Sequence, residues 1–192
     1  MQKERNLFGP RGERVMTTRT EFTLWLTPRE PLRSLLRSTI RQLASRFDAV
    51  EFEPHVTVFS APSTDIEALA VARRIAAQFS PIELTACCLD HSESYTKTLF
   101  VQFRNSALLR QIFDTAAAQY SRSSNYILNP HLSLIYKKLS LANRRKLCET
   151  LDVSMGGYGF DRVRMIETEQ PIDDDGPIRR WRVLCDELLS GS

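Results

Sequence analysis

The chain contains one five-residue pattern twice, as P-H-V-T-V at residues 54–58 and as P-H-L-S-L at residues 130–134. Each copy has proline, histidine, an aliphatic residue, a hydroxyl residue and a second aliphatic residue in the same order. With ordinary residue usage, a second histidine falls into such a context by chance on the order of one time in a thousand. We therefore interpret the two segments as equivalent strands in two similar halves of one fold.

The elements predicted around the two pentapeptides also repeat. Alternating or apolar runs predict strands at residues 22–27, 53–60, 82–89, 98–103, 126–136, 160–168 and 180–185, and helical spacing predicts helices at 31–47, 65–79, 107–119 and 141–151. This order is almost two copies of one unit and predicts the α+β class. We expect the polar segment 91–97 to border a site and the acidic segment 171–176 to be a hairpin-like connection.

Composition limits the domain organisation and the kind of partner. Residues 1–19 mix charges with glycine and proline, so we expect a flexible N-terminal extension and a single domain over residues 20–190. The net charge of +3 and the pI near 8.8 favour a small anionic ligand. They lack the strong excess of Lys and Arg that a duplex-binding protein needs.

The sequence also bears on location and redox state. No apolar stretch reaches the roughly 20 residues that cross a bilayer, so we expect no membrane partner and a cytoplasmic location. The four cysteines, Cys87, Cys88, Cys148 and Cys185, form no C-x-x-C pair. We expect reduced thiols without a catalytic role.

The two pentapeptides bring polar side chains to one face of each strand. Residues two apart in a strand share a face, so His55 projects beside Thr57 and His131 beside Ser133. The aliphatic residues between them face the core. If the two halves pack about a pseudo-twofold axis, two imidazoles and two hydroxyls meet across a groove.

Such a groove suits the opening of a cyclic phosphodiester by water. One neutral histidine can take a proton from water while a second, protonated histidine gives one to the departing oxygen. Thr57 and Ser133 can donate hydrogen bonds to the non-bridging phosphate oxygens. This scheme requires no metal and no cofactor. A zinc site is the competing interpretation, but two histidines without a third ligand leave the coordination incomplete.

At these motifs the chain resembles the 2H phosphoesterase superfamily, and within it the cyclic phosphodiesterases of plants and yeast. The resemblance spans about residues 22–188 and includes F-T-L-W-L-T-P, L-S-L-I-Y and W-R-V-L-C. It implies a bilobal fold of two antiparallel sheets with outer helices, related by pseudo-twofold symmetry around a central active-site groove. It also implies hydrolysis of ADP-ribose 1″,2″-cyclic phosphate and of nucleoside 2′,3′-cyclic phosphates, the latter to 2′-phosphates. The catalytic residues would be His55, Thr57, His131 and Ser133.

Four further residues are candidates for substrate binding. Tyr136 matches a family tyrosine that contacts phosphate, although strand alternation places it on the opposite face from the second histidine unless the strand ends there. Tyr95 and Lys97 lie in the loop expected to border the groove, with a solvated loop as the alternative. Trp25 could stack on a base or fill the core. We assign the third histidine, His91, to the surface.

We expect His55 to protonate the leaving oxygen and His131 to activate water; exchanging the two roles would leave the reaction class unchanged. One alternative keeps the site but assigns RNA 2′,3′-cyclic ends, or another 2′-linked phosphodiester, as the substrate. Long RNA needs an extended basic path, and we expect the arginines at 33, 37, 41 and 46 on the solvated face of their helix instead. A second alternative is a non-catalytic sensor of a phosphorylated nucleotide. We expect a monomer that binds a small cyclic phosphate.

Overall fold

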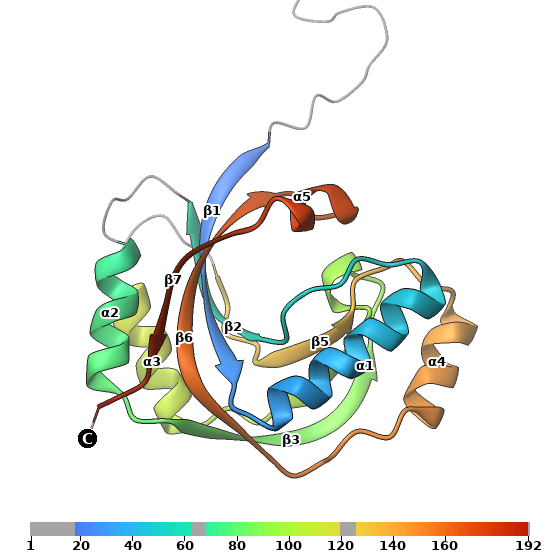
Figure 1. Ribbon diagram of the computed structural model, residues 1–192, viewed down its shortest axis with the longest axis horizontal. Helices are drawn as coiled ribbons and strands as arrows, with labels where there is room; N and C mark the ends of the chain where they lie inside the picture. Colours follow the sequence, from blue (N-terminus) through green and yellow to red (C-terminus); the bar gives the residue numbers. More distant parts are fainter. Residues whose placement is uncertain (1–17, 63–67, 120–125, 192) are drawn as a thin grey trace, which may run out of the picture.

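A computed structural model describes residues 18–62, 68–119 and 126–191 (Figure 1). The strands are β1 (Arg19–Pro28), β2 (Val56–Pro62), β3 (Ile82–His91), β4 (Leu99–Phe103), β5 (His131–Ile135), β6 (Gly157–Gln170) and β7 (Arg182–Leu188). The helices are α1 (Leu32–Phe47), α2 (Ala68–Gln78), α3 (Ala107–Ala117), α4 (Leu141–Thr150) and α5 (Asp175–Arg179), with a 3-10 turn η1 (Tyr95–Lys97). The predicted α+β class is confirmed.

The strands pair antiparallel in one sheet of order β1-β2-β5-β4-β3-β6-β7, and β6 also pairs with β1. The two expected sheets are therefore joined. The long strand β6 runs through both halves, because its first residues pair with β3 while its remaining length pairs with β1. On the other side, β2 and β5 meet only at the pair Val56 and Leu132. The histidine strands thus diverge from a single point of contact.

The strand pairing has the twofold relation that the repeated pentapeptides predict. Exchanging β1, β2 and β3 with β4, β5 and β6 maps the β1–β2 pair onto β4–β5 and the β1–β6 pair onto β4–β3. The β2–β5 and β3–β6 pairs map onto themselves. The helices follow the same exchange, since α1 packs on β5 and α3 packs on β2. Each histidine motif therefore occupies the equivalent place in its half.

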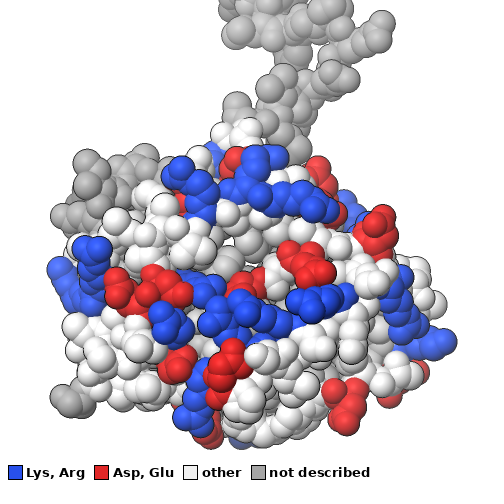
Figure 2. Space-filling view, viewed as in Figure 1, with Lys and Arg blue, Asp and Glu red and all other residues white. Residues whose placement is uncertain are grey.

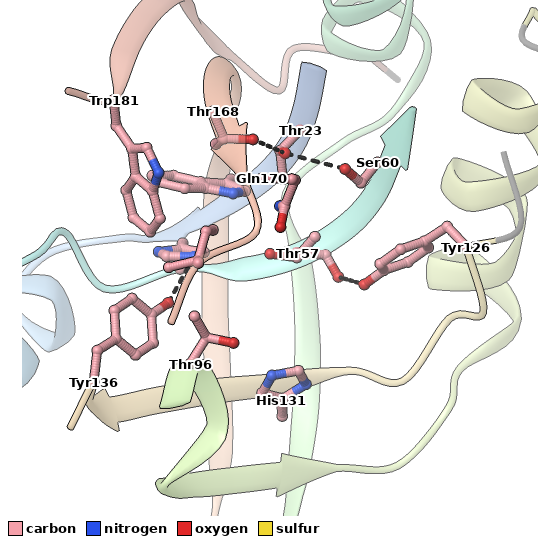
Figure 3. Close-up of a pocket in the computed structure, with 13 residues that line it drawn as sticks. Thr23, Thr57, Ser60, Thr96, Tyr126, His131, Tyr136, Thr168, Gln170 and Trp181 are labelled. Carbon is pink, nitrogen blue, oxygen red and sulfur yellow. Dashed lines mark hydrogen bonds between the residues drawn. The ribbon is translucent and has the colours of Figure 1, made fainter. Parts of the chain in front are cut away.

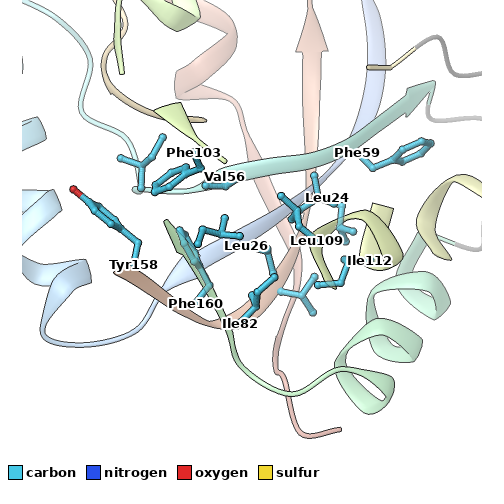
Figure 4. Close-up of a cluster of buried hydrophobic side chains, with 14 of the residues drawn as sticks. Leu24, Leu26, Val56, Phe59, Ile82, Phe103, Leu109, Ile112, Tyr158 and Phe160 are labelled. Carbon is cyan, nitrogen blue, oxygen red and sulfur yellow. The ribbon is translucent and has the colours of Figure 1, made fainter. Parts of the chain in front are cut away.

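The aliphatic residues of both motifs anchor the histidine strands in the core. They are fully buried, as expected from strand alternation: Val56, Val58, Leu132 and Leu134. Figure 4 shows Val56 in the same cluster as Leu24 and Leu26 of β1. Burying one such side chain contributes about 1.5–3 kcal/mol relative to leaving it exposed. The apolar face therefore fixes the strands that position the polar face.

Two strands are shorter at their start than the sequence predicts. Strand β2 begins at Val56 rather than at residue 53, and β5 begins at His131 rather than at residue 126. In each case a proline, Pro54 or Pro130, comes directly before the histidine. Proline has no backbone N–H to donate to a neighbouring strand, so the pairing begins only after it. His131 is consequently the first residue of β5, and His55 lies one residue before β2.

Near both ends of the chain, the observed elements differ further from the predicted ones. The connection predicted at residues 171–176 leads into α5, whose first turn is capped by the Asp174 side chain accepting from the Gly176 N–H. Strand β1 begins at Arg19, inside the predicted extension, while residues 1–17 lie outside the described residues. Among the helices that the structure describes, none is long and apolar enough to cross a membrane.

Candidate active site

The two histidine motifs line one cavity of about 190 Å³. His55, Thr57 and His131 all contribute to its wall. In Figure 3, His131 lies on β5 and Thr57 lies across the cavity on β2. Two imidazoles that are far apart in the chain therefore face the same space, as the paired pentapeptides predict.

The two imidazoles are oriented in the same way. The Nδ1 atom of His55 lies 2.6 Å from the carbonyl oxygen of Glu53, and the Nδ1 atom of His131 lies 2.7 Å from the carbonyl oxygen of Asn129. A carbonyl oxygen only accepts, so each Nδ1 carries a proton and donates it. In the neutral ring Nε2 is then the atom that can take a proton. The structure fixes one tautomer at both motifs.

Burial controls the ionisation of both histidines. It lowers the pKa of His55 to about 3, opposed by the hydrogen bond to Glu53 and reinforced by the charges of His131 and Arg164. Burial also lowers the pKa of His131 to about 4, opposed by the hydrogen bond to Asn129 and reinforced by the charge of Lys97. Both imidazoles are therefore neutral near pH 7. An anion bound between them would raise the pKa of each.

Aromatic side chains form one side of the cavity around His55. The indole of Trp25 stacks on the His55 imidazole, with ring centroids 3.5 Å apart and planes inclined by 9°. Trp181 contacts Trp25 edge-on at a centroid distance of 5.2 Å. Trp25 is 4% exposed, so it both fills the core and lines the cavity. His55 occupies one face of its indole, which leaves that face unavailable to a nucleobase.

Tyr136 lines the cavity because β5 ends just before it. Strand β5 stops at Ile135, so Tyr136 is released from the alternation that would turn it away. Its hydroxyl oxygen lies 3.4 Å from His55 Nε2. Burial raises the pKa of Tyr136, so the hydroxyl keeps its proton and can donate it. The stacked ring of Phe52, 3.7 Å away, fixes its orientation.

The two motif hydroxyls differ in their surroundings. Thr57 lines the cavity, and its hydroxyl has no hydrogen-bond partner among the residues that the structure describes. Ser133 is 4% exposed, does not line the cavity, and donates to the carbonyl oxygen of Thr96 at 2.7 Å. Thr96, which the sequence did not single out, lines the cavity instead. Of the two motif hydroxyls, only that of Thr57 is available to donate to a bound phosphate.

The structure does not bring Tyr95 and Lys97 into the cavity wall. Tyr95 is buried with Tyr136 and Ile178, and its hydroxyl donates to Asp175. The 3-10 turn η1 thus directs its ring inward. The Lys97 Nζ atom lies 4.1 Å from the centre of the Phe100 ring. Lys97 therefore acts on the site through its charge, which lowers the pKa of His131.

Of the four α1 arginines, Arg37, Arg41 and Arg46 are exposed as expected, whereas Arg33 is half-buried. Arg33 and Arg37 each approach the Glu53 carboxylate to 2.5 Å, and Arg164 lies 3.8 Å from it. The Arg33 side chain is 18% exposed. These cations hold the residue whose carbonyl orients His55.

On the face shown in Figure 2, Lys and Arg side chains lie beside Asp and Glu side chains. Across residues 18–62, 68–119 and 126–191, no three His, Cys, Asp or Glu side chains could share a metal ion.

Comparison with known families places the chain among the 2H phosphoesterases, a class of phosphodiester hydrolase. Residues 21–189 match the family model of cyclic phosphodiesterase-like proteins, and the chain belongs to that family. No curated protein sequence matches the chain.

Solved structures of low sequence identity share the fold. E. coli LigT in complex with 3′-AMP superposes with a TM-score of 0.56 at 13% identity, over 90% of this chain and 99% of that chain. TT0787 of Thermus thermophilus superposes with a TM-score of 0.60 at 15% identity, over 90% of this chain and 99% of that chain.

Proposed function

We propose that the chain hydrolyses nucleoside 2′,3′-cyclic phosphates to 2′-phosphates, and ADP-ribose 1″,2″-cyclic phosphate by the same chemistry, without a metal ion. One observation supports this most strongly: His55 and His131 line the same cavity, and each is held through Nδ1 so that Nε2 is left for proton transfer. A cyclic phosphodiester needs two proton transfers on opposite sides of one phosphorus atom.

In the proposed reaction, Nε2 of His131 takes a proton from water while the water oxygen bonds to phosphorus. The bond between phosphorus and O3′ breaks, and Nε2 of His55 gives its proton to O3′. A nearby cation lowers the pKa of each ring, Lys97 that of His131 and Arg164 that of His55, so these charges do not distinguish the acid from the base. The anionic substrate favours the protonated form of His55. Exchanging the two roles would leave the reaction class unchanged.

Neutral donors stabilise the charge that develops on phosphorus in this scheme. The Thr57 hydroxyl can donate to a non-bridging oxygen, and the Tyr136 hydroxyl lies close enough to His55 to reach the same phosphate. Neither donor has to lose a proton. Ser133 could join them only by releasing the Thr96 carbonyl.

A small nucleotide is the substrate that the surroundings favour. LigT, which shares the fold, has been crystallised with 3′-AMP. The α1 arginines that could bind RNA are paired with acids instead, Arg33 and Arg37 with Glu53, and Arg41 with Glu51. RNA ends are therefore the less favoured substrate. The cytoplasmic location and the monomeric state stay predictions.

A product assay tests this proposal. With adenosine 2′,3′-cyclic phosphate, we expect adenosine 2′-phosphate as the product and the same rate with or without EDTA, because the two histidines supply both proton transfers. Phosphorus NMR distinguishes the 2′- and 3′-phosphates. Loss of turnover with EDTA and its recovery with an added divalent metal would contradict the metal-independent scheme. A cyclic-ended oligonucleotide that is turned over faster, with a steep dependence on salt, would favour RNA as the substrate.

A further inference from the structure

One side of the cavity is built from neutral polar side chains outside the two motifs. They come from β1, β2 and β6, and we call them the polar shelf: Thr23, Ser60, Thr168 and Gln170. Hydrogen bonds of 3.2 Å join Thr168 to Thr23 and Thr23 to Ser60. Figure 3 shows this row of hydroxyls across the cavity from His131. The shelf therefore lies on the other side of the cavity from His131 and consists of residues outside the two histidine motifs.

The hydroxyl protons of the shelf are used within the protein. Ser60 donates to the Glu21 carboxylate at 2.8 Å, and that carboxylate is ion-paired with Arg19 at 2.7 Å. The Thr23 hydroxyl can then donate its single proton either to Ser60 or to Thr168. The Thr168 hydroxyl can donate its proton either to Thr23 or to the carbonyl oxygen of Glu21, which lies 3.4 Å away. Whichever pattern holds, the Thr23 and Thr168 oxygens each keep at least one lone pair that can accept, and both residues line the cavity.

Gln170 supplies the hydrogen-bond donors that the shelf hydroxyls lack. Its side-chain amide lines the cavity and makes no hydrogen bond with any other residue in the described part of the chain. It offers one acceptor oxygen and two N–H donors. Within residues 18–62, 68–119 and 126–191, no Lys, Arg, Asp or Glu lines this cavity. The shelf thus matches a neutral group with N–H donors and disfavours a second phosphate, whose oxygens would meet the threonine lone pairs.

We propose that the polar shelf is a subsite for a nucleobase with an exocyclic amine, adenine or cytosine. The amine donates to the threonine oxygens, and the Gln170 amide pairs with the edge formed by the amine and the neighbouring ring nitrogen. A side-chain amide is the group that proteins use to read this edge of adenine. Uracil and hypoxanthine place a carbonyl oxygen where the amine would be, so lone pairs face lone pairs. The inference rests on the proposed function, in which the histidines hold the phosphate of the same ligand.

Two matched substrate pairs test the subsite. The first pair is cytidine and uridine 2′,3′-cyclic phosphate, and the second is the adenosine and inosine compounds. Within each pair, the first member has an exocyclic amine where the second has a carbonyl oxygen, at the position that the shelf would contact. We expect kcat/KM to be about ten-fold or more higher for the amine-bearing member of each pair, as one good bidentate contact to a base edge usually gives. Gln170→Met and Thr168→Val should each move the ratio towards one. Gln111→Met, on the exposed side of α3, is the matched control and should keep the wild-type ratio.

A substrate without a base distinguishes an effect on base binding at the shelf from an effect on the hydrolysis step. Glycerol 1,2-cyclic phosphate carries no base, so Gln170→Met should lower its kcat/KM by a clearly smaller factor than it lowers kcat/KM for adenosine 2′,3′-cyclic phosphate. Calorimetry with adenosine and inosine 2′-monophosphates reads the subsite without any reaction, and we expect the adenosine compound to bind more tightly by a similar factor. Equal rates and equal affinities within the pairs would overturn the subsite and leave hydrolysis intact. Failure to turn over any cyclic phosphate would overturn the proposed function, and the affinity ratio would still decide the subsite.

Discussion

Replacing His55 or His131 with alanine should lower kcat/KM for a nucleoside 2′,3′-cyclic phosphate by about 10²–10⁴-fold, the usual contribution of a positioned acid or base. Each imidazole transfers one of two required protons, so the remaining one cannot complete the reaction. The double variant should be only slightly less active than either single variant, because residues that act as a unit give non-additive losses. Initial rates with a purified cyclic nucleotide measure all three variants.

The third histidine supplies the control for this series. His91 does not line the cavity, and His91→Ala should keep the wild-type rate. Thermal unfolding of each variant shows whether the fold survives, which matters for His55 because it stacks on Trp25. A folded His55→Ala or His131→Ala variant with near-normal turnover would contradict the proposed acid-base pair.

Replacing Thr57 with valine should lower kcat by about 10²–10³-fold, as the loss of one oxyanion donor does elsewhere, with a smaller change in KM. The hydroxyl is available, and it donates most strongly when charge develops on the phosphate oxygens. Thr57→Ser restores the donor and should recover most of the rate. Steady-state kinetics on the same substrate measure both variants.

Two comparisons sharpen the Thr57 result. Thr150→Val, at the exposed end of α4, removes a hydroxyl that does not line the cavity and should have no effect on kcat. Ser133→Ala should cost less than Thr57→Val, because the Ser133 hydroxyl already donates to Thr96. Equal losses at Thr57 and Ser133 would mean that Ser133 leaves Thr96 and joins the phosphate during turnover.

The sequence predicts the histidine pair well because two local rules are enough. Strand alternation places His55 and Thr57 on one face, and the repeat of the same pentapeptide implies an equivalent strand for His131. Buried Val56 and Leu132 confirm that alternation. The prolines before each histidine also explain why the strands begin late.

The rest of the cavity depends on contacts between distant segments. Thr23, Thr168 and Gln170 come from β1 and β6, whose pairing brings residues at opposite ends of the chain together. Thr23 lies within F-T-L-W-L-T-P, but no short motif marks Thr168 or Gln170. The hydrogen bond of the Ser133 hydroxyl also depends on a distant segment. Strand alternation predicts the face on which Ser133 lies, but it cannot predict that the Thr96 carbonyl accepts from its hydroxyl.

The arginines of α1 show the limit of helical patterning. Their spacing predicts a face turned away from the core, and the pattern alone cannot show that Glu53 approaches that face. In the structure Arg33 and Arg37 bind the Glu53 carboxylate, and the Glu53 carbonyl accepts from His55. A surface that the sequence assigns to solvent therefore supports the active site.

The most direct measurement is a crystal structure of the chain with adenosine 2′-monophosphate, the product of the proposed reaction. Nε2 of His55 and Nε2 of His131 should each lie about 2.6–3.2 Å from oxygen atoms around the same phosphorus, within reach of proton transfer. A phosphate that contacts only one of the two rings, or that binds outside their cavity, would contradict the account.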